Sequence, residues 1–330
     1  VTLQALQDEA LDEGLLARRI EAAAALRDGV LPPATNAYRL LHGEGDRLPG
    51  VVCDVYGDTA VLRLDGPAAL AWRDRVVKVL WPVLQARGQA HLLIRVGARG
   101  QQKVELLFGQ QPEVLLWVEE HGMRMPADLL QGQKTGLFLD HRESRRRLRD
   151  LAKGRRVLNL YGYTGGFSVS AGLGGAAHVC TVDRSRWACD LAELAWAENG
   201  LEPKAHDSHA ESVQVFLENL DATSLPYDLI VSDPPSFAPS QDKRNAALQA
   251  YRALHRSVFA RIAPGGLVLA ASCSSHVNRE DFDKSLIDGA RQAGGVLQVL
   301  ERWGAPADHP RLGTFPEGDY LKVSLCRLLS

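Results

Sequence analysis

The sequence predicts an α/β fold, in which a mostly parallel sheet with helices on both faces follows a smaller α+β unit. From about residue 150, apolar segments alternate with glycine-bearing turns and helical stretches. The apolar segments are VLNLY, HVCTVD, YDLIVSD and GLVLAAS. Such alternation is typical of βαβ units. Two more predicted strands, VLQVLERW and YLKVSLCRL, lie on either side of a Pro- and Gly-containing loop near the end.

The first part of the chain has another pattern. Residues 3–28 carry Leu and Ala at helical spacing, which predicts one or two amphipathic helices ended by Pro32 and Pro33. The segments VVCDVYGDTAVLRLDG and HLLIRV predict strands and a hairpin, and residues 72–88 between them have helical periodicity. We therefore predict two domains, a small α+β domain over residues 1–119 and a second domain over 120–330.

Composition places the chain among ordinary globular proteins. Its 330 residues are 45% hydrophobic and 24% charged, with a net charge of −2. No stretch approaches the ~20 apolar residues of a membrane span, and the acidic start VTLQALQDEALDEG is unlike a signal peptide. We expect a cytoplasmic protein with no membrane partner. The oligomeric state, including a homodimer, stays open.

The cysteines show no sign of a metal site or a disulfide framework. The five are widely spaced, without the Cys or His clusters that bind zinc: Cys53, Cys180, Cys189, Cys273 and Cys326. We predict free thiols and no metal.

One basic run concentrates positive charge. The sequence RESRRRLRDLAKGRR, residues 142–156, has eight Arg or Lys residues against Glu143 and Asp150. An RNA-binding surface and an ordinary solvated helix face both agree with such a run.

Glycines follow the first strand of the second part. In VLNLYGYTGGFS, Gly162, Gly165 and Gly166 separate a strand ending at Tyr161 from a helix starting near Phe167. Glycines let the backbone pass close to a ligand, and a helix start offers free amides. Plain tight turns and dinucleotide-binding domains use similar glycines, although the spacing here does not match G-x-G-x-x-G.

Asp183 ends the next strand, HVCTVD. A carboxylate there can accept hydrogen bonds from both hydroxyls of a ribose, and a helix cap shared with Ser185 is the alternative. With the preceding glycines, Asp183 predicts a nucleoside-type cofactor.

Asp233, Pro234 and Pro235 follow the strand segment YDLIVS, with Phe237 beyond them. Two prolines stop a strand and fix the backbone, at the sheet edge where ligands of α/β proteins bind. A simple turn is the alternative.

Cys273 directly follows the predicted strand segment GLVLAAS. A free cysteine is usually an inert apolar side chain, as we expect for Cys180 and Cys189. The strand before Cys273 should lie beside the strand before Asp233, so its thiol is a candidate nucleophile.

Seven collinear segments together cover nearly the whole chain and are similar to class I methyltransferases, more narrowly to the RlmI-like family of large-subunit rRNA cytosine-C5 methyltransferases. They are LPGVVCDVYGD (48–58), EEHGMRM (119–125), QGQKTGLFLDHRESR (131–145), LNLYGYTGGFSVSA (158–171), SDPPSFAPSQ (232–241), ASCSS (271–275) and ADHPRLGTFPEGDYLKV (307–323).

The resemblance implies a Rossmann-like, seven-stranded, mostly parallel sheet, with S-adenosyl-L-methionine as cofactor and RNA, notably large-subunit rRNA, as partner. It implies that Asp183 binds the cofactor ribose, that Glu211 or Asp207 binds the adenine edge, and that Asp233 lies between methyl donor and base. The small domain would contact RNA. The other implied cofactor residues are Gln133, Lys134, Thr135, Gly136, Tyr161, Gly165 and Phe167.

Two features depart from the family pattern. Its members commonly begin with a small RNA-binding PUA domain, and this chain starts where that domain would end, so a naturally short relative and a trimmed sequence both stay open. The loop RGQQK, residues 99–103, does not clearly match.

Cytosine C5 needs activation before it accepts a methyl group, so the resemblance implies that the thiolate of Cys273 adds to C6. Asp233 would then stabilise the protonated ring, and His276 and Asp140 are candidate bases for the C5 proton. The expected substrate contacts are Pro234, Pro235, Phe237, which could stack on the base or fill the core, and Arg142.

Two rival functions stay open. The first is methylation of an exocyclic amine held by the Asp-Pro-Pro corner, and the second is a non-catalytic factor for RNA or ribosome assembly that binds S-adenosylmethionine. An NAD-dependent oxidoreductase is disfavoured because G-x-G-x-x-G is missing.

Overall fold

The computed structural model describes residues 12–97, 103–220, 225–238 and 240–329. The chain divides into two compact units, one made of residues 1–142 and 306–318 and the other of 143–305 and 319–330. The expected order, an α+β part before an α/β part, is confirmed. The predicted boundary after residue 119 falls inside the first unit, and the two-domain division stays a prediction. Most of RGQQK and residues 3–11 of the first predicted helix lie outside the described residues.

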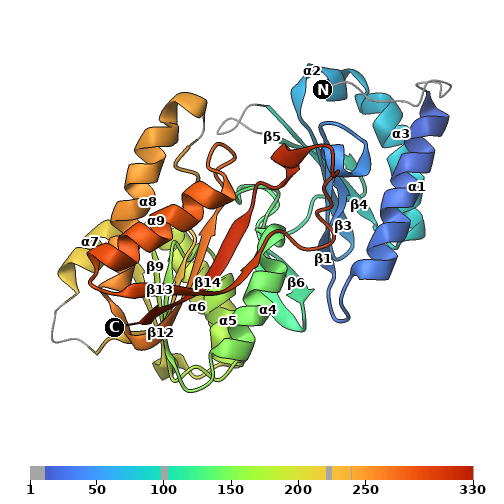
Figure 1. The fold of residues 1–330 in the computed structure, drawn as a ribbon. Helices are drawn as coiled ribbons and strands as arrows, with labels where there is room; N and C mark the ends of the chain where they lie inside the picture. The colour runs from blue at the N-terminus through green and yellow to red at the C-terminus, as the bar shows by residue number, and fades with distance from the viewer. Residues whose placement is uncertain (1–11, 98–102, 221–224, 239, 330) are drawn as a thin grey trace. The chain divides into compact units, whose positions relative to one another are not determined.

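The first unit is built on a five-stranded sheet of order β1-β2-β3-β4-β5 (Figure 1). The expected hairpin is formed by β2 and β3, in which Val55 pairs with Ala60. Helix α1 begins where the Asp12 side chain accepts a hydrogen bond from the amide of Leu15 at 2.9 Å, as expected of an N-cap. The unit's helices and strands are α1 (Glu13–Val30), β1 (Ala37–His42), β2 (Val51–Tyr56), β3 (Thr59–Leu64), α2 (Gly66–Ala71), α3 (Arg73–Ala86), β4 (His91–Val96), β5 (Lys103–Phe108), β6 (Leu116–Glu120) and β7 (Met123–Ala127).

A buried charge network joins distant segments of the first unit. Both oxygens of Asp308 accept hydrogen bonds from the guanidinium of Arg142, at 2.8 and 2.9 Å. The Asp308 carboxylate also accepts from the amide of Arg39 at 3.0 Å, and its carbonyl oxygen accepts from Arg27 at 2.8 Å. Arg27 in turn forms a two-pronged ion pair with Asp46. These bonds attach the segment 306–318 to the rest of the unit.

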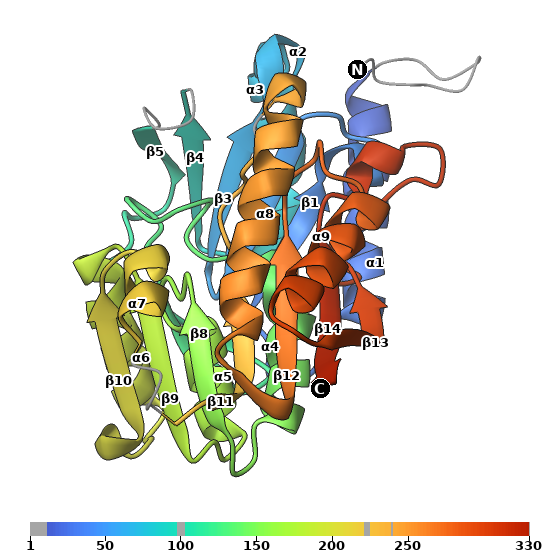
Figure 2. The ribbon, with the colours of Figure 1, turned by 60° about the vertical axis from the view of Figure 1, so that its left-hand side comes forward.

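The second unit has a seven-stranded sheet of order β10-β9-β8-β11-β12-β14-β13 (Figure 2). Its first five strands are parallel to one another, β14 is antiparallel to β12, and β13 is antiparallel to β14. The strands are β8 (Arg156–Leu160), β9 (His178–Asp183), β10 (His206–Ala210), β11 (Tyr227–Ser232), β12 (Ile262–Ser272), β13 (Val296–Trp303) and β14 (Lys322–Leu329).

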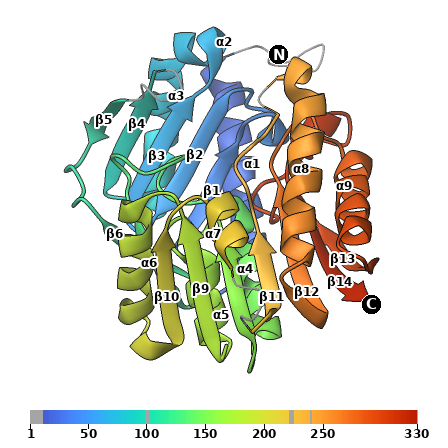
Figure 3. The same ribbon diagram turned by 90° about the vertical axis from the view of Figure 1, so that its left-hand side faces the viewer.

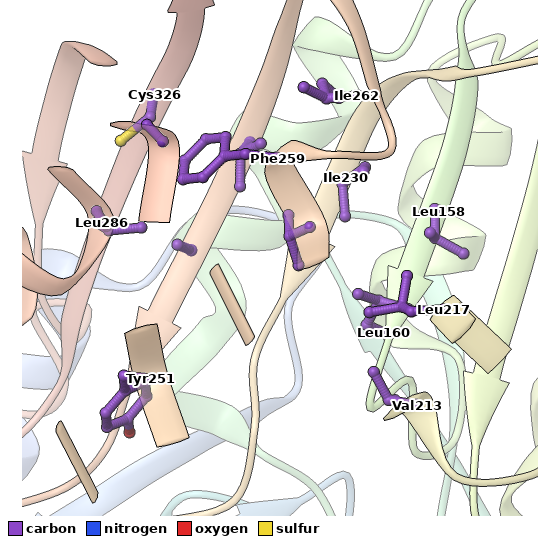
Figure 4. Packing of buried hydrophobic residues seen from close by; sticks show 14 of the residues in the cluster. Leu158, Leu160, Val213, Leu217, Ile230, Tyr251, Phe259, Ile262, Leu286 and Cys326 are labelled. Atoms are coloured by element: carbon purple, nitrogen blue, oxygen red, sulfur yellow. The ribbon is translucent and has the colours of Figure 1, made fainter. Parts of the chain in front are cut away.

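Helices cover both faces of this sheet, because its strands are apolar on both sides (Figure 3). Leu158, Leu160 and Ile230 pack with α7, α8 and α9, as Figure 4 shows for the labelled residues. Val157, Leu229 and Val231, from the same strands, pack with α4, α5 and α6 on the other face. The helices are α4 (Arg142–Leu151), α5 (Gly166–Leu173), α6 (Arg186–Glu198), α7 (Val213–Asn219), α8 (Arg244–Phe259) and α9 (Arg279–Gln292).

We expect Asp308→Asn to lower the free energy of unfolding by about 3–5 kcal/mol, because it removes the buried carboxylate charge that is paired with the Arg142 guanidinium. Burial alone would raise the pKa of Asp308, but its contacts with His309 and Arg142 hold that pKa well below the ordinary value. The stabilisation is therefore complete above about pH 4 and is lost only as the pH falls through the lower folded pKa. Urea unfolding measures the change.

Asp65→Asn is the matched control, since Asp65 pairs with Arg63 at the surface and should change stability by less than about 1 kcal/mol. Equal effects of the two substitutions would contradict the role given to Asp308.

Candidate functional site

The parallel strands of the second unit end together at one edge. Leu160 of β8 pairs with Val182 of β9 and with Ser232 of β11, and Ser232 pairs with Ala270 of β12. The next residue of each strand therefore lies at the same edge of the sheet. These residues are Tyr161, Asp183 and Asp233. Cys273 lies three residues beyond Ala270. The prediction that its strand lies beside the strand before Asp233 is confirmed.

The glycine turn after β8 depends on close packing. A Cβ atom on Gly162 would lie 2.5 Å from Cγ2 of Thr181, and one on Gly165 would lie 2.6 Å from Cβ of Ala192. Gly165 also has φ +77°, and Tyr161 and Tyr163 have φ +59° and +45°. Left-handed backbone at two tyrosines is uncommon and costs energy. Close packing thus holds the turn in a backbone conformation that would otherwise be rare. Helix α5 starts at Gly166, next to the start predicted near Phe167.

A chain of hydrogen-bonded polar side chains connects the strands and the helix on either side of this turn. The side-chain amide of Asn159 donates to Oγ of Ser168 at 2.8 Å, and Oγ of Ser168 lies 2.6 Å from Oγ1 of Thr181. Thr181 continues the chain to Nε2 of His206 at 2.7 Å. Asn159, Ser168 and Thr181 lie inside segments quoted above, but no role was predicted for their side chains, and His206 lies outside those segments.

Asp183 holds the glycine turn through its carboxylate. One oxygen accepts from the amide of Tyr163 at 2.9 Å, and the other accepts from the amide of Ser185 at 2.9 Å. Ser185 itself caps α6 by accepting from the amide of Ala188. Asp183 therefore has the local structural role that was the alternative to ribose binding. Each carboxylate oxygen can still accept a further hydrogen bond, so a role in ribose binding remains compatible with these contacts.

The two candidates for the adenine edge lie at different levels of the sheet. Ala210, the last residue of β10, pairs with Asp183, and Glu211 follows it. Asp207 pairs with Cys180, three residues back along the strand, which is roughly 10 Å at the rise of a strand. The Asp207 carboxylate lies 3.0 Å from Nε2 of His178. Only Glu211 shares the edge with Asp183.

The Asp-Pro-Pro corner is held from the neighbouring strand by Ser274. Its Oγ accepts from the amides of Phe237 and Ala238 at 3.2 and 3.4 Å and lies 3.2 Å from Oγ of Ser236. The ring of Phe237 packs on the core, 4.9 Å from that of Tyr251. These contacts favour the core role among the two readings of Phe237. Pro234 is buried and Pro235 exposed.

Cys273 differs from the other cysteines because it is partly exposed, whereas the other four are buried. Burial raises the pKa of Tyr251 to about 12, and its hydroxyl lies 2.8 and 3.0 Å from Oγ of Ser272 and Ser274. Lys322 donates to the carbonyl oxygen of Ser274 at 2.9 Å. Neither Tyr251 nor Lys322 was predicted as a site residue, although the segments that resemble the family include Ser274 and Lys322.

Three of the eight basic residues in the run 142–156 form ion pairs within their own unit. Arg146 pairs with Glu143 and Asp150, and Arg147 pairs with Glu301 at 2.5 Å. Arg142, predicted to contact substrate, is 1% exposed and engaged by Asp308. These ion pairs favour the solvated-face interpretation for part of the run, and the substrate role of Arg142 stays a prediction.

Other predicted residues lie in the first unit. Thr135 is buried and donates to Asp54 at 2.5 Å, with its Oγ1 2.8 Å from the hydroxyl of Tyr56. Lys134 lies 3.3 Å from Asp140. The cofactor role of Gln133, Lys134, Thr135 and Gly136 stays a prediction. So does that of Phe167, which is 7% exposed in the second unit and packs in its core.

Two broader features concern the described ranges alone. No group of three or more His, Cys, Asp or Glu side chains in them could hold a metal ion. No helix in them is long and apolar enough to cross a membrane.

Comparison with known proteins identifies the family. The family model of S-adenosylmethionine-dependent methyltransferases matches residues 67–322. The chain is 35% identical to ribosomal RNA large subunit methyltransferase I of Erwinia tasmaniensis, over 98% of this chain and 83% of that protein. The Yersinia pseudotuberculosis protein of the same name is 34% identical over the same shares.

Solved structures agree with this result. A methyltransferase complexed with SAH is 25% identical, with a TM-score of 0.88 over 97% of this chain and 83% of that one. An S-adenosylmethionine-dependent methyltransferase from Streptococcus mutans is 26% identical, with a TM-score of 0.87 over the same shares. S-adenosylmethionine is thus the cofactor. The chain belongs to the S-adenosylmethionine-dependent methyltransferase family, in its RlmI-like branch.

Proposed function

We propose that this methyltransferase forms 5-methylcytosine in large-subunit rRNA, with Cys273 as its nucleophile. The observation that carries the proposal is the partly exposed thiol of Cys273 at the end of β12, beside the strand that leads into the Asp-Pro-Pro corner. The names of the relatives, which are ribosomal RNA large subunit methyltransferases, support RNA as the substrate.

The residues at the sheet edge suit the cofactor. The carboxylate of Asp183 would accept hydrogen bonds from the ribose hydroxyls, and that of Glu211 would accept one from the adenine amine. The glycine turn and the start of α5 bring backbone amides to the same edge. Tyr161 and Gly165 belong to this turn. The bound cofactor supplies the methyl group.

The chemistry at the pyrimidine begins with the thiolate of Cys273, which adds to C6 and makes C5 nucleophilic. Asp233 hydrogen-bonds the N3 and N4 edge and stabilises the protonated ring. Pro234 and Pro235 fix the backbone on which Asp233 lies. The base must leave its stack to enter this site. His276, three residues after Cys273, and Asp140 are the two candidates for the base that removes the C5 proton before the thiolate leaves.

We expect Glu211→Gln to weaken S-adenosylmethionine binding roughly tenfold, because a charge-assisted hydrogen bond contributes about 1.5–3 kcal/mol. Asp207→Asn is the matched control and should leave the affinity unchanged, since Asp207 lies three residues back from the sheet edge. Isothermal titration calorimetry measures both affinities. A larger loss for Asp207→Asn would contradict the assignment of the adenine edge to Glu211.

We expect Cys273→Ala to keep S-adenosylmethionine binding and to abolish methylation of rRNA, because no other group in the proposed mechanism adds to C6. Transfer of labelled methyl groups to total rRNA measures turnover. Cys189→Ala is the control, because this thiol is buried and should be dispensable. Near-native methylation by the Cys273→Ala protein would refute the nucleophile assignment.

RNA that contains 5-fluorocytosine separates cytosine-C5 chemistry from methylation of an exocyclic amine. Fluorine at C5 replaces the proton that must be removed before the thiolate can leave, so the enzyme stays bound to C6. The Cys273 mechanism therefore predicts a covalent protein–RNA complex that survives denaturation and is absent in Cys273→Ala. Methylation of normal rRNA with no trapped complex would favour the amine reaction. Cofactor binding with no S-adenosylhomocysteine released in the presence of rRNA would favour a non-catalytic factor.

A further inference from the structure

Lys322 is a buried charged residue next to Cys273 in the sheet. Its side chain is almost wholly enclosed, with 2% of the residue exposed. In the ladder between β12 and β14, Lys322 pairs with Ser272, the residue immediately before Cys273. Its Nζ donates to the carbonyl oxygen of Ser274, the residue immediately after Cys273, at 2.9 Å. Lys322 thus contacts the chain on both sides of the predicted nucleophile.

The surroundings of Lys322 do little to offset the cost of burying its charge. Both of its hydrogen bonds go to neutral carbonyl oxygens, those of Ser274 and, at 2.8 Å, of Tyr320. An ammonium removed from water is expensive unless it is paired. Burial lowers the pKa of Lys322 to about 8, the charge of Arg279 also lowers it, and Cys273 and Asp319 raise it. At pH 7 the group is therefore still mostly protonated.

We propose that Lys322 is a positioning residue for Cys273, which fixes the backbone on both sides of the thiol and stabilises the thiolate with its positive charge. This inference rests on the proposed function. An ordinary cysteine has a pKa of about 8.5, so only a few per cent is thiolate at pH 7. A neighbouring cation raises that share. The sulfur keeps the electron pair of the S–H bond, and the proton passes to water.

The same Ser274 that accepts from Lys322 through its carbonyl also holds the Asp-Pro-Pro corner through its hydroxyl. One residue therefore links the lysine, the backbone of the nucleophile and the corner that carries Asp233. A displaced Ser274 would move both reacting side chains, so the position of Lys322 matters as well as its charge.

The test is the pH dependence of alkylation of Cys273 by iodoacetamide, followed at that peptide by mass spectrometry. Because the other four cysteines are buried, the Cys273→Ala protein gives the background. We expect Lys322→Met, which keeps the chain length and removes the charge, to raise the midpoint by about one pH unit. This corresponds to roughly tenfold slower alkylation at pH 7. Lys322→Arg keeps the positive charge, so its alkylation midpoint should stay close to that of the wild-type protein.

Lys284→Met is the matched control, since Lys284 is an exposed lysine on α9 and should leave the midpoint unchanged. An unchanged midpoint in a Lys322→Met protein that still binds S-adenosylmethionine would overturn the inference. If the Lys322→Met protein does not fold, the alkylation midpoint of Cys273 in the wild-type protein is the test. A midpoint at or above about pH 8.5 contradicts thiolate stabilisation. A midpoint clearly below that value supports the proposal.

Turnover distinguishes this inference from the proposed function. Lys322→Met should lower kcat roughly tenfold at pH 7, leave KM for S-adenosylmethionine unchanged and recover part of kcat at pH 9, where the thiol ionises without help. A purely structural role for Lys322 would give a loss that does not depend on pH. Full activity of Cys273→Ala would refute the nucleophile while leaving the alkylation result intact.

Discussion

The backbone ladder that joins β8, β9, β11 and β12 in parallel is the constraint on which the candidate site depends. Parallel strands point the same way, so their carboxyl ends meet at one edge. The pairs Leu160–Ser232 and Ser232–Ala270 bring the glycine turn, the Asp-Pro-Pro corner and Cys273 to that edge, although these segments are spread over more than a hundred residues of the chain. A shift of one residue in any register would move every side chain of that strand to the opposite face of the sheet and would misalign the strand ends. The site and the core are therefore fixed together.

Buried charge is used differently in the two units. Asp308 is surrounded by the guanidinium of Arg142, the amide of Arg39 and the ring of His309, so its charge is compensated and the network stabilises the fold. Lys322 has only carbonyl oxygens as hydrogen-bond partners. Burying a charge with so little compensation costs free energy, and a neutral side chain could make similar contacts between the backbone near Ser274 and Tyr320. The positive charge of Lys322 has a function if the neighbouring Cys273 must become an anion.

Positive charge in the sequence does not translate directly into a surface for RNA. The run 142–156 contains eight basic residues, yet Arg142, Arg146 and Arg147 are paired with carboxylates of their own unit. Arg156 lies over the ring of Tyr227. Arg146 pairs with Glu143 and Asp150 of its own helix. The partners of Arg142 and Arg147, which are Asp308 and Glu301, come from distant parts of the chain, and the helix sequence alone does not reveal them.

Local periodicity and short motifs were enough to predict the order of elements, the glycine turn and the strand-end positions of Asp183, Asp233 and Cys273. The likeness to methyltransferases was also visible in these short motifs. The tertiary structure decided what depends on register and on contacts over long separations. It set Glu211 apart from Asp207, packed Phe237 on the core, and enclosed Arg142 beside Asp308. It also placed Lys322 next to Cys273, which no pattern within either segment could reveal, because antiparallel pairing of β12 with β14 alone brings residues 272 and 322 together.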